Sequence, residues 1–333
     1  MVGGVNVVST SALPIDLAAQ VAAAVPGARV SVPAAGHLGL EARDLSEVDA
    51  LVCLLRDRVD AAVLARAPRL RVVANCAVGL DNIDLPAASA AGVWVTHTPD
   101  VLTDATAELA IAMLLAAARR LGEGERLVRA GQWTGWALDQ LLGVGLSGKT
   151  LGIIGLGRIG QAVARRAIGL GMHVVHADPR PAGGRAREAP ASAPRRVELD
   201  ELFAISDAVS LHCPLTPATR HVVDARRLAL MKPTAVLVNT ARGDCVDHAA
   251  LVRALEAGQL FAAALDVYPR EPELDPALRS CPRLTLLPHI GSATTEARTA
   301  MAQLCADAVI AALRGLPPPN LVNREVPTWN RRS

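Results

Sequence analysis

The chain has 333 residues, of which 51% are hydrophobic and 20% are charged, and its formal net charge is +2. This composition excludes a disordered chain, and the length is sufficient for two globular domains. The near-neutral charge argues against a nucleic-acid-binding protein, which normally carries a dense basic stripe. No stretch of 18 residues is uninterruptedly apolar, so we expect no membrane span.

The six cysteines form no C-x-x-C pair, and no group of histidines and cysteines has the spacing of a zinc site. We therefore predict no metal site. The opening residues MVGGVNVVST lack the basic and apolar regions of a signal peptide. Free thiols without such a leader indicate a cytoplasmic protein, because disulfides persist mainly in oxidising compartments.

Residues 1–100 alternate between strand-like and helix-like segments. VNVVST and ARVSV flank the helix-like PIDLAAQVAAAV, and the alternation continues through LRVVANCAV and LPAASAAG to VWVTHTP. The strands are continuous apolar runs, which is typical of a parallel sheet covered on both faces. The links between the segments are short, as in βα units. This region therefore predicts an α/β domain.

The pattern changes at TDATAELAIAMLLAAARR, where Thr103 or Asp104 can cap a long helix that could bridge two domains. The following segment, GQWTGWALDQLLGVGLSGKT, contains Trp133 and Trp136 and has little regular pattern. It predicts either a loop packed on its own chain or a loop that reaches a partner subunit, since exposed tryptophans favour interfaces.

A second series of strands and helices runs from TLGIIGLGRIG to TLLPHIG, and a last long helix covers SATTEARTAMAQLCADAVIAALRG. Long helices therefore stand at both ends of this series, which suggests that the chain leaves the first domain and later returns to it. We predict a first domain segment over 1–100, a second domain over 101–291, and a return to the first domain over 292–333.

The sequence GLGRIG places Gly155, Gly157 and Gly160 at G-x-G-x-x-G spacing, after an apolar strand and before a helix. This context predicts a dinucleotide site, and each glycine has a separate physical reason. Gly155 permits the tight turn, Gly157 lets the backbone approach a pyrophosphate, and Gly160 lets helix and strand pack closely. The helix N-terminus then offers N–H donors to the phosphates. The alternative is a glycine-rich turn without a ligand.

Asp178 ends the next predicted strand, MHVVHAD, 18 residues after Gly160. A carboxylate at this place accepts hydrogen bonds from a ribose 2′-OH and repels a 2′-phosphate, which favours NAD over NADP. Arg180 would partly offset this repulsion, so NADP stays an alternative cofactor.

Charged residues follow three predicted strands of the second series: Arg242 after VLVN, Asp266 and Glu271 after AAL, and His289 after TLLP. Each alone has a structural alternative, such as a surface arginine, a solvated glutamate or a buried histidine. Ligands of open α/β sheets bind outside the carboxyl ends of the strands. There, an arginine can bind a carboxylate by two hydrogen bonds, and a histidine oriented by a carboxylate can donate a proton. Together the residues predict hydride transfer to a 2-oxo acid.

With these residues the chain resembles the D-2-hydroxyacid dehydrogenases, and among them most the glyoxylate/hydroxypyruvate reductases. The resemblance extends over nearly the whole chain and rests on ANCAVGLDNIDL, HTPDVLTDATAELAIAMLL, GQWTGW, GKTLGIIGLGRIGQAVARRA, LHCPLTPATRH, VNTARGDCVD, ALDVYPREP and LLPHIGSAT. It implies an α/β fold of two Rossmann-like or flavodoxin-like domains with parallel sheets, a discontinuous substrate domain made of both chain ends, and a homodimer. It also implies reduction of glyoxylate or hydroxypyruvate by NADH or NADPH.

The resemblance also assigns roles to individual residues. It implies that Arg242, Glu271 and His289 are catalytic, that backbone amides near Val78 and Gly79 hold the substrate carboxylate together with Arg242 and His289, and that Asp266 lies near the nicotinamide carboxamide. Including the three glycines, the implied cofactor contacts are Thr106, Gly155, Gly157, Arg158, Ile159, Gly160, Asp178, Pro214, Thr219, Thr240, Ala241, Asp266 and Gly291.

One departure from the family pattern and two alternative functions stay open. Several glyoxylate/hydroxypyruvate reductases end the second cofactor strand with a neutral residue and an arginine and use NADPH, whereas this chain has HADPRP. The substrate could instead be another D-2-hydroxyacid, of the phosphoglycerate or D-lactate type. A non-catalytic NAD-sensing module is a further alternative, although a sensor does not need a proton donor.

Overall fold

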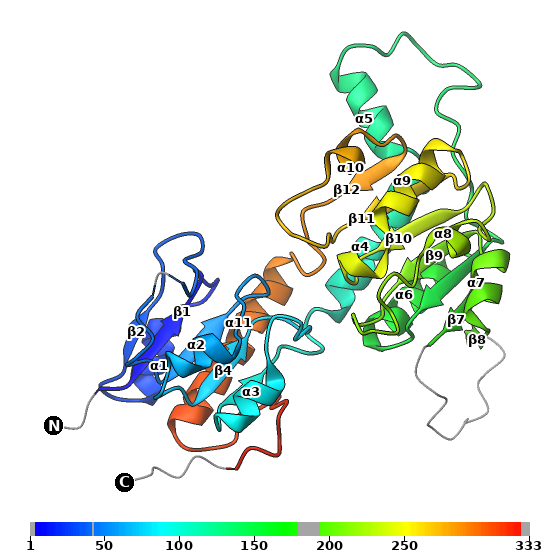
Figure 1. Ribbon diagram of the computed structural model, residues 1–333. Coiled ribbons are helices and arrows are strands. Elements are labelled where there is room, and N and C mark those ends of the chain that lie inside the picture. The colour runs from blue at the N-terminus through cyan, green and yellow to red at the C-terminus, as the bar shows by residue number, and fades with distance from the viewer. Residues whose placement is uncertain (1–3, 42, 179–193, 328–333) are drawn as a thin grey trace. The chain divides into compact units, whose positions relative to one another are not determined.

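The computed structural model describes residues 4–41, 43–178 and 194–327 (Figure 1). It divides into two compact units. The first unit combines both ends of the chain, Met1–Leu102 and Ser292–Ser333, and the second is the continuous segment Thr103–Gly291. Each unit contains one parallel sheet.

The first unit has a five-stranded parallel sheet in the order β2-β1-β3-β4-β5. This is the strand order of flavodoxin-like folds. Its elements are β1 (Asn6–Ser9), α1 (Leu17–Ala24), β2 (Arg29–Ser31), β3 (Ala50–Cys53), α2 (Ala61–Ala65), β4 (Val72–Asn75), α3 (Leu85–Ala90), β5 (Trp94–Thr96) and α11 (Thr295–Leu313).

Strand β3 shows why the strands of this sheet are continuously apolar. Ala50 and Val52 belong to a buried cluster that includes residues of α11, whereas Leu51 and Cys53 belong to a second cluster. Successive side chains of a strand point to opposite faces, so both faces of the sheet are covered. The C-terminal helix α11 packs on β3, β4 and β5, which is how the last part of the chain joins this unit.

The second unit has a seven-stranded parallel sheet in the order β12-β11-β10-β9-β6-β7-β8. The chain starts in the middle at β6, builds outwards to β8, and then returns to build from β9 to β12. Its elements are α4 (Thr103–Ala118), α5 (Leu121–Arg129), β6 (Thr150–Ile154), α6 (Arg158–Gly169), β7 (His173–Ala177), β8 (Arg195–Arg196), α7 (Leu199–Ile205), β9 (Ala208–Leu211), α8 (Ala225–Leu228), β10 (Val236–Asn239), the 3₁₀ turn η1 (Gly243–Cys245), α9 (His248–Glu256), β11 (Ala262–Leu265), α10 (Pro276–Ser280) and β12 (Leu284–Leu286).

The order of strands in this sheet places a topological switch point between β6 and β9. In doubly wound sheets the ligand binds at such a point, outside the carboxyl ends of the strands. The expected α/β class with two parallel-sheet domains is therefore confirmed, and the second unit has the Rossmann strand order.

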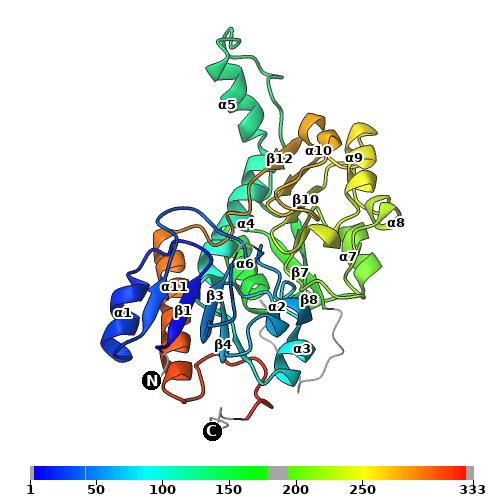
Figure 2. The ribbon, with the colours of Figure 1, turned by 60° about the vertical axis from the view of Figure 1, so that its left-hand side comes forward.

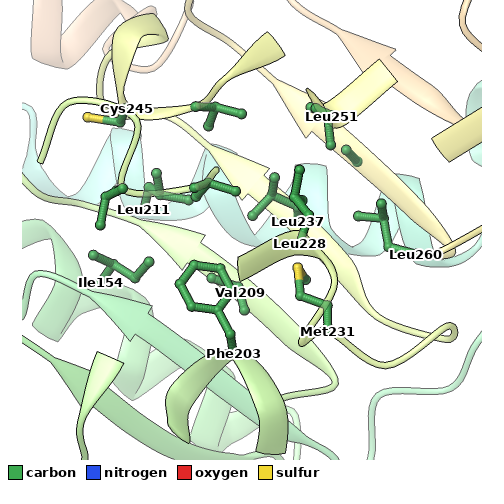
Figure 3. Packing of buried hydrophobic residues seen from close by; sticks show 14 of the residues in the cluster. Ile154, Phe203, Val209, Leu211, Leu228, Met231, Leu237, Cys245, Leu251 and Leu260 are labelled. Atoms are coloured by element: carbon green, nitrogen blue, oxygen red, sulfur yellow. The ribbon is translucent and has the colours of Figure 1, made fainter. Parts of the chain in front are cut away.

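Helix α4 belongs to the second unit and begins at its first residue, Thr103. It packs on α6 and β10 and buries Met113 and Leu114 in one of the two large clusters of this unit. The other cluster includes Phe203 and Leu237 and is shown in Figure 3. The sheet is thus packed on both faces, which holds its strand ends in fixed register.

Helix α5 and the chain after it extend away from the seven-stranded sheet in both ribbon views (Figures 1 and 2). The helix has no buried residue. The side chains of Trp133, Trp136 and Leu138 are 54%, 81% and 81% exposed. Both tryptophans are therefore more than half exposed in the described part of the chain. Among the described residues, no helix is long and apolar enough to cross a membrane.

Candidate active site

The glycine-rich turn after β6 has the geometry that a dinucleotide phosphate needs. Gly155 has a φ of +91°, and a Cβ there would lie 2.8 Å from the carbonyl oxygen of His212, so only glycine fits. A Cβ at Gly160 would collide with the carbonyl oxygen of Gly155. Around Gly157, by contrast, the space is open, and this residue starts α6 without a side-chain cap. The first N–H groups of α6 can therefore bind an anion.

Two predicted cofactor residues of this edge, Thr240 and Thr219, differ in the hydrogen bonds of their hydroxyl groups. The hydroxyl oxygen of Thr240 is buried and has no hydrogen-bond partner among the described residues, which fits a polar ligand group. Thr219 is different, because its hydroxyl donates to the carbonyl of Pro214 at 2.6 Å and accepts from the amide of Thr216 at 2.8 Å. Thr219 thus holds its own loop in shape.

The remaining predicted residues lie at the same carboxyl edge of the seven-stranded sheet. Thr106, in the first turn of α4, approaches Gly291, and Arg158 and Ile159 are the first residues of α6. Asp178 follows β7, and Arg196 donates a hydrogen bond to its backbone carbonyl at 3.3 Å. Arg180 lies outside the described residues.

His289 and Glu271 form a hydrogen-bonded pair, with 2.6 Å between Nδ1 of the ring and Oε2 of the carboxylate. A carboxylate only accepts, so Nδ1 carries the hydrogen of this bond and Nε2 is the ring nitrogen left for a second partner. The other oxygen, Oε1, accepts from the amide of Tyr268 at 2.8 Å. Burial raises the pKa of Glu271, but the hydrogen bond and charge of His289 outweigh it and hold the pKa below its usual value. Glu271 is therefore a carboxylate at neutral pH.

The backbone of His289 is held in an unusual conformation by Asp266. The φ of His289 is +56°, in the left-handed region that costs a residue with a Cβ about 1–2 kcal/mol. The next two amides, of Ile290 and Gly291, each donate to one oxygen of Asp266 at 2.8 Å. Burial raises the pKa of Asp266, and the two amide bonds oppose this effect. Asp266 thereby fixes the backbone that follows His289.

Arg242 follows β10 and is brought towards the same pair. Its guanidinium donates to the carbonyl of Ala241 at 2.7 Å, and its charge is one of the causes of the lowered pKa of Glu271. A Cβ on the next residue, Gly243, would collide with the backbone of Tyr268. Because Gly243 has no side chain, the backbone that follows Arg242 can lie against the backbone of Tyr268, three residues before Glu271.

Three supporting residues of this site were not found from the sequence. Asn239 donates to the carbonyl of Arg242 at 2.8 Å and accepts from the amide of Ala241 at 3.0 Å. The hydroxyl of Tyr268 is within bonding distance of the carbonyls of Leu265 and Leu287, at 3.1 and 2.9 Å, and so joins the ends of β11 and β12. Gly243 is the third. Tyr268 is the only tyrosine of the chain and stands between Asp266 and Glu271, so its place in the sequence could have indicated a role in the site.

Val78 and Gly79 lie in the first unit, in the loop after β4 at the carboxyl end of its sheet. Both residues are partly exposed. Among the residues that the structure describes, no group of three or more histidine, cysteine, aspartate or glutamate side chains is arranged to hold a metal ion.

Comparison with known proteins decides the family. Residues 111–291 match the model of the D-isomer specific 2-hydroxyacid dehydrogenase, NAD binding domain. The chain belongs to the D-2-hydroxyacid dehydrogenase family. It is 47% identical over 303 residues to the glyoxylate reductase of Thermococcus litoralis, an alignment that covers 89% of this chain and 90% of that protein.

Solved structures agree with this assignment. The TT0316 protein from Thermus thermophilus has a TM-score of 0.87 at 43% identity, over 95% of this chain and 99% of that one. The NADPH-dependent glyoxylate/hydroxypyruvate reductase of Sinorhizobium meliloti, solved with NADP and malonate, has a TM-score of 0.82 at 30% identity, over 99% of this chain and 100% of that one. The dehydrogenase is thus an NAD(P)-dependent oxidoreductase, with its matched NAD-binding residues inside the second unit.

Proposed function

We propose that the dehydrogenase reduces small 2-oxo acids, namely glyoxylate to glycolate and hydroxypyruvate to D-glycerate. The observation that carries this proposal is the pair of His289 and Glu271, 2.6 Å apart beside Arg242, at the sheet edge that also holds the glycine turn. An arginine and an oriented histidine supply the two groups that reduction of a 2-oxo acid requires, an anchor for the carboxylate and a proton for the carbonyl oxygen. The glyoxylate reductase name of the Thermococcus litoralis relative supports this choice of substrate.

In this proposal the residues have separate tasks. Arg242 binds the substrate carboxylate and polarises the 2-oxo group, and the amides of Val78 and Gly79 bind the same carboxylate. His289 donates the proton from Nε2 to the developing alkoxide, while Glu271 keeps the ring oriented and favours its charged form. The bound nicotinamide supplies the hydride to the 2-carbon.

We further propose that the second unit is the cofactor domain and the first unit the substrate domain. The first amides of α6, with Arg158 and Ile159, hold the pyrophosphate, and the free hydroxyl of Thr240 donates to the cofactor. The contacts of the other residues follow the resemblance: Thr106, Asp178, Pro214, Thr219, Ala241, Asp266 and Gly291. Both carboxylate oxygens of Asp266 already accept backbone amides, so its main task is to fix the His289 loop.

For the choice of cofactor we propose NADH as the preferred donor and NADPH as the weaker one. Asp178 stands at the end of β7, where a carboxylate binds a ribose 2′-OH and repels a 2′-phosphate. The neighbouring Arg196 contacts the Asp178 backbone, and its charge would partly offset that repulsion.

We propose that the dehydrogenase is a homodimer in which the arm of residues 121–142 is covered by a second copy of the chain. The exposed tryptophans and leucine of this arm support the proposal, because contiguous exposed apolar side chains mark interfaces. Replacement of Trp133 and Trp136 together by serine should lower the mass measured by light scattering to that of a monomer. An unchanged dimer would contradict the role of the arm. The six free cysteines support a reducing, cytoplasmic location.

The activity is tested by NADH and NADPH oxidation with glyoxylate, hydroxypyruvate, pyruvate and 3-phosphohydroxypyruvate, monitored by absorbance. We expect the highest kcat/KM with glyoxylate or hydroxypyruvate and NADH. A clear preference for pyruvate or 3-phosphohydroxypyruvate would overturn the substrate assignment. Tight NADH binding without turnover of any acid would indicate an NAD-sensing module instead.

A further inference from the structure

The loop Ala77–Leu80 of the first unit is held by its carbonyl groups. Four consecutive carbonyls of this loop each accept a hydrogen bond from a donor of the same unit. The donors are the amide of Thr98 to Ala77 at 2.8 Å, Nδ1 of His97 to Val78 at 3.1 Å, Nδ2 of Asn75 to Gly79 at 2.8 Å, and the amide of Ile83 to Leu80 at 3.0 Å.

Two of these four donors are side chains, and the first is His97. It follows β5, the strand that pairs with β4, and so comes close to the loop that follows β4. A carbonyl oxygen only accepts, so Nδ1 of His97 must carry the hydrogen of this bond. The bond therefore fixes the Val78 carbonyl.

The second side-chain donor is Asn75, which is itself fixed. Its side chain is fully buried, and its Oδ1 accepts from Nδ2 of Asn82 at 3.2 Å. The same Nδ2 of Asn82 also lies within bonding distance of the carbonyls of Leu54 and Asp57, at 3.1 and 3.0 Å. Asn82 thus connects Asn75, and through it Gly79, to the loop after β3.

The backbone N–H groups of Val78 and Gly79 differ from the carbonyls of the loop in their hydrogen bonding. Among the described residues, the N–H groups of Val78 and Gly79 donate to no protein acceptor. When the carbonyls are held from inside the unit and the amides are left without a partner, the loop presents ordered donors, as in backbone anion sites. Such donors bind an anion well because their orientation needs no further ordering on binding.

We propose that His97, Asn75 and Asn82 are positioning residues for the reduction, which hold the Val78 and Gly79 amides in the orientation that binds the substrate carboxylate. This inference rests on the proposed function of the loop. The three side chains do not touch the substrate. They set its affinity by fixing two carbonyls of the backbone that does: His97 holds that of Val78, and Asn75, itself held by Asn82, holds that of Gly79.

The test replaces His97 by leucine or by asparagine and measures KM for glyoxylate, KM for NADH and kcat. His97→Leu removes the donor to Val78, and we expect KM for glyoxylate to rise about 5- to 50-fold, the range for a hydrogen-bonded group left without its partner. KM for NADH should be unchanged and kcat should stay within about threefold. His97→Asn should restore KM for glyoxylate to within about threefold, because Nδ2 of asparagine occupies nearly the same place as Nδ1 of the imidazole.

Asn82→Ala gives an independent variant, and we expect the same selective rise of KM for glyoxylate. Its matched control is Asn6→Ala, because Asn6 also donates from Nδ2 to a backbone carbonyl, that of Glu47 at 2.9 Å, but at the start of β1 on the opposite edge of the same sheet. The control should leave both KM values unchanged. Thermal melting followed by circular dichroism identifies the variants that fold. If Asn82→Ala does not fold, His97→Leu and its rescue by asparagine test the inference alone.

Unchanged KM for glyoxylate in the folded His97→Leu and Asn82→Ala enzymes would overturn this inference and leave the proposed function intact. An equal rise of KM for glyoxylate and NADH, or no rescue by asparagine, would also overturn it, since either indicates a general structural role. No turnover of any 2-oxo acid by the unmodified enzyme would overturn the proposed function and this inference together.

Discussion

At the carboxyl edge of the seven-stranded sheet, the groups proposed to act on the substrate are side chains, those of Arg242, Glu271 and His289. At the carboxyl edge of the five-stranded sheet they are backbone amides, those of Val78 and Gly79. The supports differ in one respect, although in both units side chains such as Asn239 also donate to backbone carbonyls. In the second unit a buried carboxylate, Asp266, accepts backbone amides. In the first unit, side chains donate to backbone carbonyls.

This difference indicates where mutational sensitivity should lie. A side chain that reacts can be removed by one substitution, so the second unit should show the large losses of kcat. Every substitution except proline keeps the backbone amide, so side-chain replacements in the first unit should act through its supporting residues and mainly in KM. The following predictions test the second unit against that expectation.

The largest loss is expected for His289→Ala. Removal of the proton donor should lower kcat by about 10²–10⁴-fold, the usual range for a general acid. Steady-state NADH oxidation at saturating glyoxylate measures this value. The matched control is His173→Ala, since His173 is an exposed histidine at the start of β7 in the same unit. Turnover near that of the control would remove His289 from the mechanism.

A smaller loss is expected for Arg242→Lys. Lysine keeps the positive charge but lacks the planar fork that binds a carboxylate by two hydrogen bonds. We expect kcat/KM for glyoxylate to fall about 100-fold, within the range for loss of one partner of a charged hydrogen-bonded pair. Arg226→Lys, on the exposed surface of α8, is the control. Equal kcat/KM values for the two variants would mean that Arg242 does not anchor the substrate.

Glu271→Gln should have a moderate effect on kcat. The pKa of Glu271 lies below its usual value because the bond and charge of His289 outweigh its burial, so the carboxylate stays charged over the whole assay range. Glutamine removes this charge and can place an NH₂ donor where Oε2 accepts the hydrogen of His289 Nδ1. We expect kcat with glyoxylate to fall about 30-fold, within the range for loss of a hydrogen bond to a charged group. An unchanged kcat would mean that Glu271 does not support His289.

The smallest effect is expected for Asp178→Ala, which tests recognition of the cofactor. The ratio of kcat/KM with NADH to that with NADPH should fall about 10-fold, because the variant loses the 2′-OH acceptor and the repulsion of the 2′-phosphate. Both effects are expected in the cofactor KM. An unmodified enzyme that strongly prefers NADPH would contradict the role assigned to Asp178.

Much of the molecule was predictable because it depends on local pattern. Continuous apolar runs indicated parallel strands, and the spacing of Gly155, Gly157 and Gly160 between a strand and a helix indicated the phosphate turn. Arg242 and His289 came soon after strands, and Glu271 followed Asp266 at the end of a third, so the parallel arrangement alone placed them at one edge. The sequence did not settle whether α4 bridges two domains, because its apolar pattern does not show which sheet covers it.

Only the tertiary structure decided which groups support the site. Gly243 is needed because the Tyr268 backbone passes it, Asp266 holds the amides that follow His289, and Asn75 is joined to Asn82 and to Gly79. Each of these contacts joins loops that come together only when the strands before them pair in register. The sequence by itself determined the chemical groups and the sheet edge that carries them, because strand periodicity and residue type are local. The orientation of those groups depends on contacts between separate loops, which no local pattern records.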